Sequence, residues 1–96
     1  MNVLRDSSRL QFSPREDAVM FDGDIITLGQ TQFDCLMELY AVWQAGFPAI
    51  HQADVLKAVR SDSSRLRDVF KGNPQAWALI ERLPGHSAMF RIVVKE

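Results

Sequence analysis

The chain has 96 residues, of which 47% are hydrophobic, and its formal net charge is −1. This length supports one compact domain, residues 1–96, and is too short for two independent cores. No apolar run approaches the roughly 20 residues of a membrane-spanning helix, and the first residues lack the basic and then apolar build of a signal peptide, so we expect a cytoplasmic protein that does not enter a membrane.

The first 28 residues predict a small antiparallel sheet. Residues 10–12 alternate apolar and polar side chains, and the β-rich runs at residues 19–21 and 25–28 flank Asp22-Gly23. An Asp-Gly pair between two such runs is a strong hairpin signal, because the turn needs positive φ values that Gly and Asp tolerate best.

From Gly29 onward the apolar residues recur at helical spacing. They are Phe33, Leu36, Met37, Tyr40 and either Val42 or Trp43. This stripe predicts an amphipathic helix whose apolar face lies in the core and which ends near residues 46–48. Its start is open. Gly29 with Gln32 could form a capping arrangement. Thr31 with Asp34 could form the same arrangement.

Cys35 is the single cysteine of the chain, so no disulfide can form within it. It falls among apolar residues of the predicted helix, where a cysteine usually behaves as a small buried hydrophobe. His51, His86 and the carboxylates show no metal-ligand spacing with it, so we expect neither a metal nor a cofactor. No nucleophile, general base and orienting acid can be assembled from the motifs, and we expect no enzyme.

Two more helices are expected before residue 75. The second begins after His51, carries Asp54 in its positive first turn and continues through residues 55–59. The third runs from residue 61 or 62 to residue 70, after a very short link. It is closed by Lys71-Gly72-Asn73-Pro74, a basic residue followed by Gly and Pro.

A third helix over these residues would have one apolar and one polar face, at about 100° per residue. The apolar sector would hold Val59, Ser63, Leu66, Val69 and Phe70, and the opposite sector Ser61, Ser64, Asp68 and Lys71. Arg60 and Arg67 would lie near Lys71, and Arg65 on the other side. Small hydroxyls permit close approach to a DNA groove, and long cations reach guanine edges or phosphates. Asp68 would repel phosphates, and the charges could instead merely solvate an exposed helix.

The last part of the chain predicts a β-hairpin. Residues 76–83 and 88–94 are strand-like runs around Pro84-Gly85. Alternation places Phe90, Ile92 and Val94 on one face and Met89, Arg91, Val93 and Lys95 on the other. Arg82, His86 and Arg91 lie on or beside this hairpin, where they could meet phosphate or the minor groove. We interpret His86 as a solvent-exposed loop histidine.

The basic side chains are concentrated in the second half of the chain. Residues 1–56 carry three basic and eight acidic side chains, a net charge of −5. Residues 57–96 carry eight basic and four acidic side chains, a net charge of +4. The basic half is therefore the half with the third helix and the hairpin.

A short helix, a turn, a basic helix and a hairpin, in this order, are the layout of a winged helix-turn-helix. That scaffold offers one helix to the DNA major groove and a hairpin to the flanking backbone. We therefore predict an α+β fold with an N-terminal sheet (1–28), a three-helix core (29–72) and a wing hairpin (75–95).

The chain resembles the winged-helix effector domain of OmpR/PhoB-type bacterial response regulators. Residues 10–28 look like the N-terminal sheet of that family, Ser64-Arg65-Leu66-Arg67 looks like a run in its recognition helix, and residues 79–92 look like its wing. The predicted link before the third helix is much shorter than in the family, where that loop often touches RNA polymerase. The resemblance implies DNA contacts at Ser64, Arg65, Arg67 and Lys71 and at Arg82 or His86.

These features predict a transcription regulator that binds double-stranded DNA in a sequence-specific manner, with the third helix in the major groove and the wing on the backbone or minor groove. The predicted contacts are Arg60, Ser61, Ser64, Arg65, Arg67, Lys71, Arg82, His86 and Arg91. One monomer offers a small footprint, so binding as a homodimer or in tandem is expected. The alternative is a winged-helix protein-interaction module, suggested by the net charge and by Asp68, Phe47 and Trp77.

Overall fold

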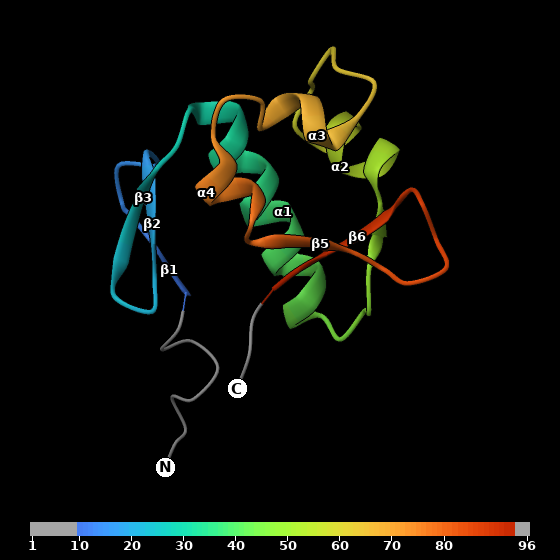
Figure 1. Cartoon of the computed structure of the whole chain (residues 1–96), viewed down its shortest axis with the longest axis horizontal. Coiled ribbons are helices and arrows are strands. Elements are labelled where there is room, and N and C mark those ends of the chain that lie inside the picture. Colours follow the sequence, from blue (N-terminus) through green and yellow to red (C-terminus); the bar gives the residue numbers. More distant parts are fainter. Residues whose placement is uncertain (1–9, 94–96) are drawn as a thin grey trace.

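The computed structural model describes residues 10–93, and Figure 1 shows how their elements are arranged. This part of the chain is a small α+β unit with four helices and two three-stranded antiparallel sheets. The expectations for Val94 and Lys95 lie outside the described residues. No helix in residues 10–93 has the length and apolar character to cross a membrane.

The N-terminal sheet follows the prediction. Its strands are β1 (Leu10–Phe12), β2 (Ala18–Phe21) and β3 (Asp24–Thr27), in that order. Asp22 and Gly23 form the turn between β2 and β3 with φ angles of 52° and 88°, as expected for a two-residue hairpin loop. Packing holds the sheet on the first helix, because the rings of Phe12 and Phe33 meet edge to face with 5.4 Å between centroids.

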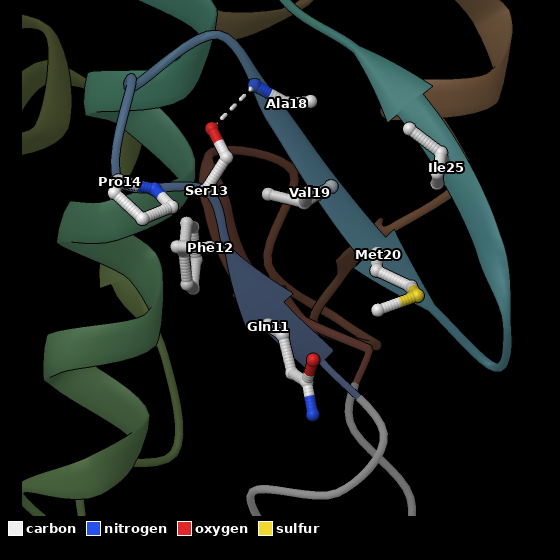
Figure 2. Close-up of a pocket in the computed structure, with 8 residues that line it drawn as sticks. All are labelled: Gln11, Phe12, Ser13, Pro14, Ala18, Val19, Met20 and Ile25. Carbon is white, nitrogen blue, oxygen red and sulfur yellow. Dashed lines mark hydrogen bonds between the residues drawn. The ribbon is translucent and has the colours of Figure 1, made fainter.

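One face of this sheet carries an apolar hollow (Figure 2). Met20 and Ile25 lie opposite each other on β2 and β3, and both are exposed. With Phe12 they line a hollow of about 260 Å³. Ser13 Oγ accepts a 3.2 Å hydrogen bond from the Ala18 N–H, which fixes the start of β2 beside it.

The helix α1 (Gln30–Gln44) runs between the two sheets (Figure 1). The Gly29 N–H donates to Gln32 Oε1 at 3.0 Å, so the first of the two predicted capping arrangements is present. The buried residues of the helix are Phe33, Cys35, Leu36 and Leu39. The prediction for Met37 was wrong, because this side chain is 43% exposed at the outer edge of the buried stripe.

A short strand, β4 (Ile50–His51), leads into α2 (Gln52–Ala58). The start of α2 after His51 is confirmed, and His51 Nδ1 accepts a 3.0 Å hydrogen bond from the Ala53 N–H as its cap. Asp54 lies in the first turn as predicted, where its charge favours the helix dipole.

The next helix, α3 (Leu66–Val69), is much shorter than predicted. Arg60 adopts a left-handed φ of 57°, its N–H donates to the Lys57 carbonyl, and the Ser61 N–H donates to the Leu56 carbonyl. These two bonds close α2 as a Schellman motif. The prediction of a helix from residue 61 or 62 after a very short link was therefore wrong, and the sector assignment does not apply to residues 59–65.

A fourth helix, α4 (Pro74–Trp77), was not predicted, and its last two residues fall in the run 76–83 that was predicted to be a strand. The Asn73 side chain accepts a 3.2 Å hydrogen bond from the Ala76 N–H, and Pro74 takes the first helical position, which its fixed φ favours. Residues 71–74 therefore end one helix and begin another, and the predicted three-helix core has four helices.

The second sheet has the order β4-β6-β5, with β5 (Ile80–Arg82) and β6 (Met89–Ile92) forming the predicted hairpin. Phe90 and Ile92 are buried, as the predicted alternation requires. The pairing of β4 with β6 brings a strand from before α2 against the hairpin. Leu66 joins the same core as the hairpin, so α3 and the second sheet are packed as one unit.

Candidate nucleic-acid interface

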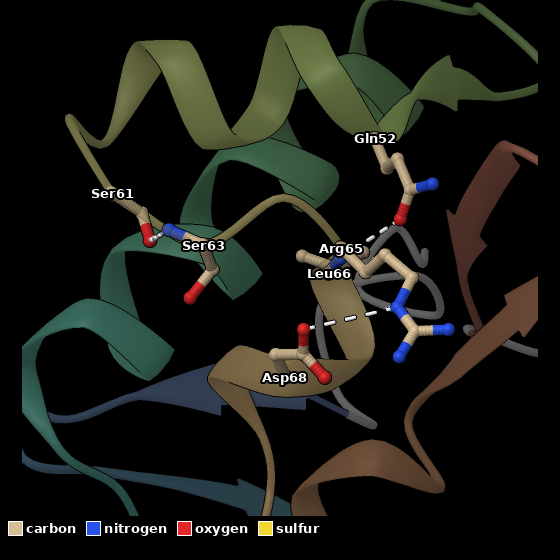
Figure 3. Close-up of polar contacts among 6 residues, drawn as sticks. All are labelled: Gln52, Ser61, Ser63, Arg65, Leu66 and Asp68. Carbon is tan, nitrogen blue, oxygen red and sulfur yellow. Dashed lines mark hydrogen bonds and ion pairs between the residues drawn. The ribbon is translucent and has the colours of Figure 1, made fainter.

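The start of α3 is fixed by a side chain from α2. The Leu66 N–H donates a 2.8 Å hydrogen bond to Gln52 Oε1 (Figure 3), which satisfies one of the free amides of the first turn. The Leu66 side chain is 0% exposed, whereas the adjacent Arg65 and Arg67 are exposed. One buried leucine thus holds two arginines at the surface.

Asp68 does not stand alone on this surface. Arg65 Nε lies 3.8 Å from Asp68 Oδ2 (Figure 3), so the carboxylate is partly offset by a neighbouring cation. Both side chains are exposed, and such a pair contributes little to stability. Its consequence is electrostatic, because Asp68 repels an approaching anion less than an isolated carboxylate does.

Two amide side chains, Gln32 and Asn73, form a clamp that holds α3 and α4 against the N-terminal end of α1. Gln32 Nε2 donates to the Val69 carbonyl at 3.0 Å. Asn73 Nδ2 donates to Gln32 Oε1 at 3.0 Å and to the Thr27 carbonyl at 2.9 Å. The turn that carries Lys71 is therefore tied to α1 and β3.

Three of the predicted DNA-contacting cations line one groove, which we call the α3–α4 groove. Its volume is about 430 Å³, and its lining includes Arg65, Arg67, Asp68, Phe70, Lys71 and Trp77. Arg67 and Lys71 are exposed, and neither forms an ion pair with an acid of residues 10–93. Their charges are therefore available to an anionic partner.

A row of aromatic rings connects this groove with the hairpin. The Trp77 ring centroid lies 5.9 Å from that of Phe70 and 5.8 Å from that of Phe90. The Arg82 guanidinium lies over the Phe90 ring, 5.6 Å from its centroid, a cation–π arrangement. Arg82 thus lies at the hairpin end of this row of rings and does not itself line the groove.

The structure separates two other predicted contacts from this groove. Arg91 forms an ion pair and a hydrogen bond with Glu81 on the neighbouring strand. It lines a different hollow together with Phe47, at the C-terminal end of α1. Arg60 lines a third hollow, in which Glu38 is one of several acidic residues. Neither arginine shares a surface hollow with the α3 cations.

The predicted polar contacts of the loop and the hairpin turn differ in availability. Ser61 Oγ accepts a 3.1 Å hydrogen bond from the Ser63 N–H inside the loop (Figure 3), and its O–H can still donate to a partner. Ser64 is exposed beside Arg65. His86 is an exposed residue between the hairpin strands, as predicted.

Four residues that shape the site were not assigned this role from the sequence: Gln32, Gln52, Asn73 and Trp77. Asn73 had a usable signal, because Asn before Pro is typical of a helix N-terminus. The bonds of Gln32 and Gln52 span 37 and 14 residues, and no local pattern indicates them. Trp77 was noted only as a candidate for contact with a protein.

The buried thiol of α1 lies away from this groove and shows the effect of the acidic half. Burial, together with the negative charges of Asp34 and Glu38, raises the pKa of Cys35 to about 12. The thiol therefore stays protonated at neutral pH. Within residues 10–93 no group of three His, Cys, Asp or Glu side chains could hold a metal ion.

Comparison with family models, with curated proteins and with solved structures finds no match to this chain. The resemblance to OmpR/PhoB-type effector domains therefore remains a prediction. It rests on the order of the sequence motifs and on the residues quoted for them.

Proposed function

We propose that the protein is a winged helix that binds double-stranded DNA and regulates transcription in the bacterial cytoplasm. The observation that carries the proposal is the gathering of Arg65, Arg67 and Lys71 around one groove, with Arg82 close by. The element order supports it, because α2, a loop, α3 and a hairpin succeed one another and β4 pairs with the hairpin.

The short α3 suggests a division of labour on DNA. A helix of four residues presents few side chains to base edges, so Ser64 and Arg65 at its start are the candidates for base contacts. Arg67, Lys71 and Arg82 suit phosphate contacts, which supply affinity and orientation. Because one such surface is small, we propose that two copies bind DNA as a dimer or in tandem.

The experiment is a gel shift with duplex DNA selected from a random pool, repeated over a range of salt concentrations. Phosphate contacts at Arg67, Lys71 and Arg82 would give a slope of log K against log salt of about −3. Replacing both arginines, Arg65→Ala with Arg67→Ala, should abolish specific binding and make the residual slope less negative by about 1, because only Arg67 of the two is assigned to a phosphate. Binding by the double variant at wild-type affinity and slope would falsify the proposal.

The matched control is Arg15→Ala compared with Arg67→Ala. Both arginines are exposed, and both substitutions remove one positive charge, but Arg15 lies between β1 and β2. The control should leave affinity nearly unchanged, whereas Arg67→Ala should reduce the salt slope by about 1. Equal losses would indicate attraction by net charge rather than binding at the groove.

A protein-interaction module is the second candidate, because Phe47 is 63% exposed and the Met20–Ile25 pair opens an apolar hollow (Figure 2). Large exposed apolar side chains that cluster often mark contact with a protein. Retention on heparin or on nonspecific DNA at low salt separates the two candidates. A protein that flows through both columns and captures a protein partner supports the second.

A further inference from the structure

Trp77 is the more exposed of the two aromatic residues, Phe70 and Trp77, that line the α3–α4 groove beside Arg67 and Lys71. It is the last residue of α4, it is half-buried, and it lines the α3–α4 groove with Arg67 and Lys71. The Asn73 cap and the bonds of the Gln32–Asn73 clamp fix α4. The indole is therefore held in place before any ligand arrives, which lowers the entropy cost of a contact.

Packing accounts for only part of the Trp77 side chain. Phe70 and Phe90 lie against it at interplanar angles of 42° and 57°, while the rest of the indole borders the groove. Its N–H donates to no acceptor within residues 10–93. Trp77 therefore adds apolar surface to the lining of the groove, and its N–H has no partner among the described residues.

Two unpaired cations beside an indole favour a ligand that is anionic and has an apolar part. Arg65 partly offsets Asp68, which leaves Arg67 and Lys71 to attract the anion. An unpaired base would need an open aromatic face for stacking, but Phe70 and Phe90 cover part of the indole. A deoxyribose between two phosphates needs only an apolar edge with cations on either side.

We infer that the α3–α4 groove holds the sugar–phosphate backbone of one strand of duplex DNA, with a deoxyribose against Trp77 and phosphates at Arg67 and Lys71. This inference rests on the proposed function. It assigns to Trp77 a part of the DNA-binding free energy that does not depend on charge. It also makes Trp77 a reporter of the contact, because indole emission depends on its surroundings.

The test uses fluorescence and affinity together. The chain has two tryptophans, so Trp43→Phe leaves Trp77 as the sole tryptophan, whose emission can be excited selectively over that of Tyr40. The phenyl ring preserves the stacking of residue 43 on Tyr40. Titration of this variant with a selected duplex should change the Trp77 emission at the stoichiometry found by gel shift. The Trp77→Phe variant should bind the duplex about threefold to tenfold more weakly with an unchanged salt slope.

A matched charge variant separates the two kinds of contact. Lys71→Ala should make the salt slope less negative by about 1, whereas Trp77→Phe should not change it. Duplex binding without a change in Trp77 emission overturns the inference and leaves the proposed function intact. Failure of the wild-type chain to bind duplex DNA overturns the proposed function, and the inference with it.

The same emission titration is repeated with single-stranded DNA. A change in Trp77 emission with single strands but not with duplex contradicts the inference and indicates a stacking site for bases instead. Circular dichroism checks that Trp77→Phe is folded. If that variant unfolds, the Trp43→Phe titration and the Lys71→Ala salt slope still decide the question, because both keep the Trp77 side chain.

Discussion

The two sheets of the protein stand on opposite sides of α1 and carry opposite charge. The N-terminal sheet belongs to residues 1–56, with a net charge of −5, and the hairpin belongs to residues 57–96, with a net charge of +4. The net charge of −1 is therefore the sum of an acidic and a basic half of the sequence.

The two regions also differ in how their elements are held. The β1-β2-β3 sheet is built from strands that follow one another along the chain. The short helices α3 and α4 instead depend on side-chain bonds from Gln52, Gln32 and Asn73 to backbone groups 14, 37 and 46 residues away. Because a single helical turn is not stable by itself, the geometry of the α3–α4 groove depends on α1 and β3.

The largest expected effect comes from removing the anchor of α3. Leu66 is 0% exposed and is the only buried residue of that helix, whereas α1 has four. Leu66→Ala should lower the free energy of unfolding by about 3 kcal/mol, measured by denaturant unfolding. Leu66→Met, which conserves volume, should cost less than about 1.5 kcal/mol. A loss below 1 kcal/mol for the alanine variant would show that α3 is held without this anchor.

Substitution of Asn73 tests whether its long-range hydrogen bonds stabilise the region of α3 and α4. Asn73→Ala removes the α4 cap and both donor bonds of the clamp and should cost about 2 kcal/mol of unfolding free energy. Asn73→Asp keeps a cap acceptor but loses the donor to the Thr27 carbonyl, so it isolates the long-range part. Equal stability of Asn73→Asp and the wild type in thermal unfolding would contradict the dependence on β3.

The N-terminal region could be predicted because its signals are local. The Asp22-Gly23 turn, the Gly29–Gln32 cap and the buried stripe of α1 each depend on residues within one or two turns of chain. The structure of residues 59–78 could not be predicted in this way. Their apolar spacing fits one helix, but the left-handed conformation of Arg60 ends α2 there. A left-handed arginine has no sequence signature, since Gly or Asn usually occupies that position.

The candidate site was predictable in its charges but not in its assembly. Arg65, Arg67 and Lys71 follow from the basic run, yet their meeting with Trp77 depends on α4, which was not predicted. Arg91 was expected at the interface because alternation exposes it. Its partner Glu81 lies directly opposite in the strand register, and that pairing follows only once the length of the hairpin loop is known.

The raised pKa of Cys35 predicts how the stability of the protein depends on pH. The pKa of this thiol is raised to about 12 from an ordinary value of 9.0, so between these values the unfolded thiol loses its proton while the folded one retains it. The unfolded state then binds fewer protons, and stability falls as pH rises above about 9. Between pH 8 and pH 10 the decrease should be about 1 kcal/mol, and it should disappear in Cys35→Ala. Because other groups ionise in this range, the quantity to compare is the difference between the two pH profiles. Parallel profiles would contradict the raised pKa.

The smallest expected effect concerns Arg60, whose left-handed conformation ends α2. Arg60 holds φ at 57° to close α2, and the left-handed conformation costs a non-glycine residue roughly 1 to 2 kcal/mol. Arg60→Gly removes this cost, but glycine also raises the conformational entropy of the unfolded chain, which offsets part of the stabilisation. The net stabilisation should be about 0.5 kcal/mol.

Arg60→Ala is the matched control for that substitution, because it removes the same charge and side chain but retains the left-handed strain. It should give no stabilisation in denaturant unfolding, and the two variants should lose the same amount of DNA affinity. Because Arg60 lines an acidic hollow rather than the α3–α4 groove, that shared loss should be smaller than the loss in Arg67→Ala. Arg60→Gly and Arg60→Ala could instead weaken DNA binding as strongly as Arg67→Ala does. That result would show that the DNA-binding surface extends from the α3–α4 groove around the end of α2 and includes Arg60.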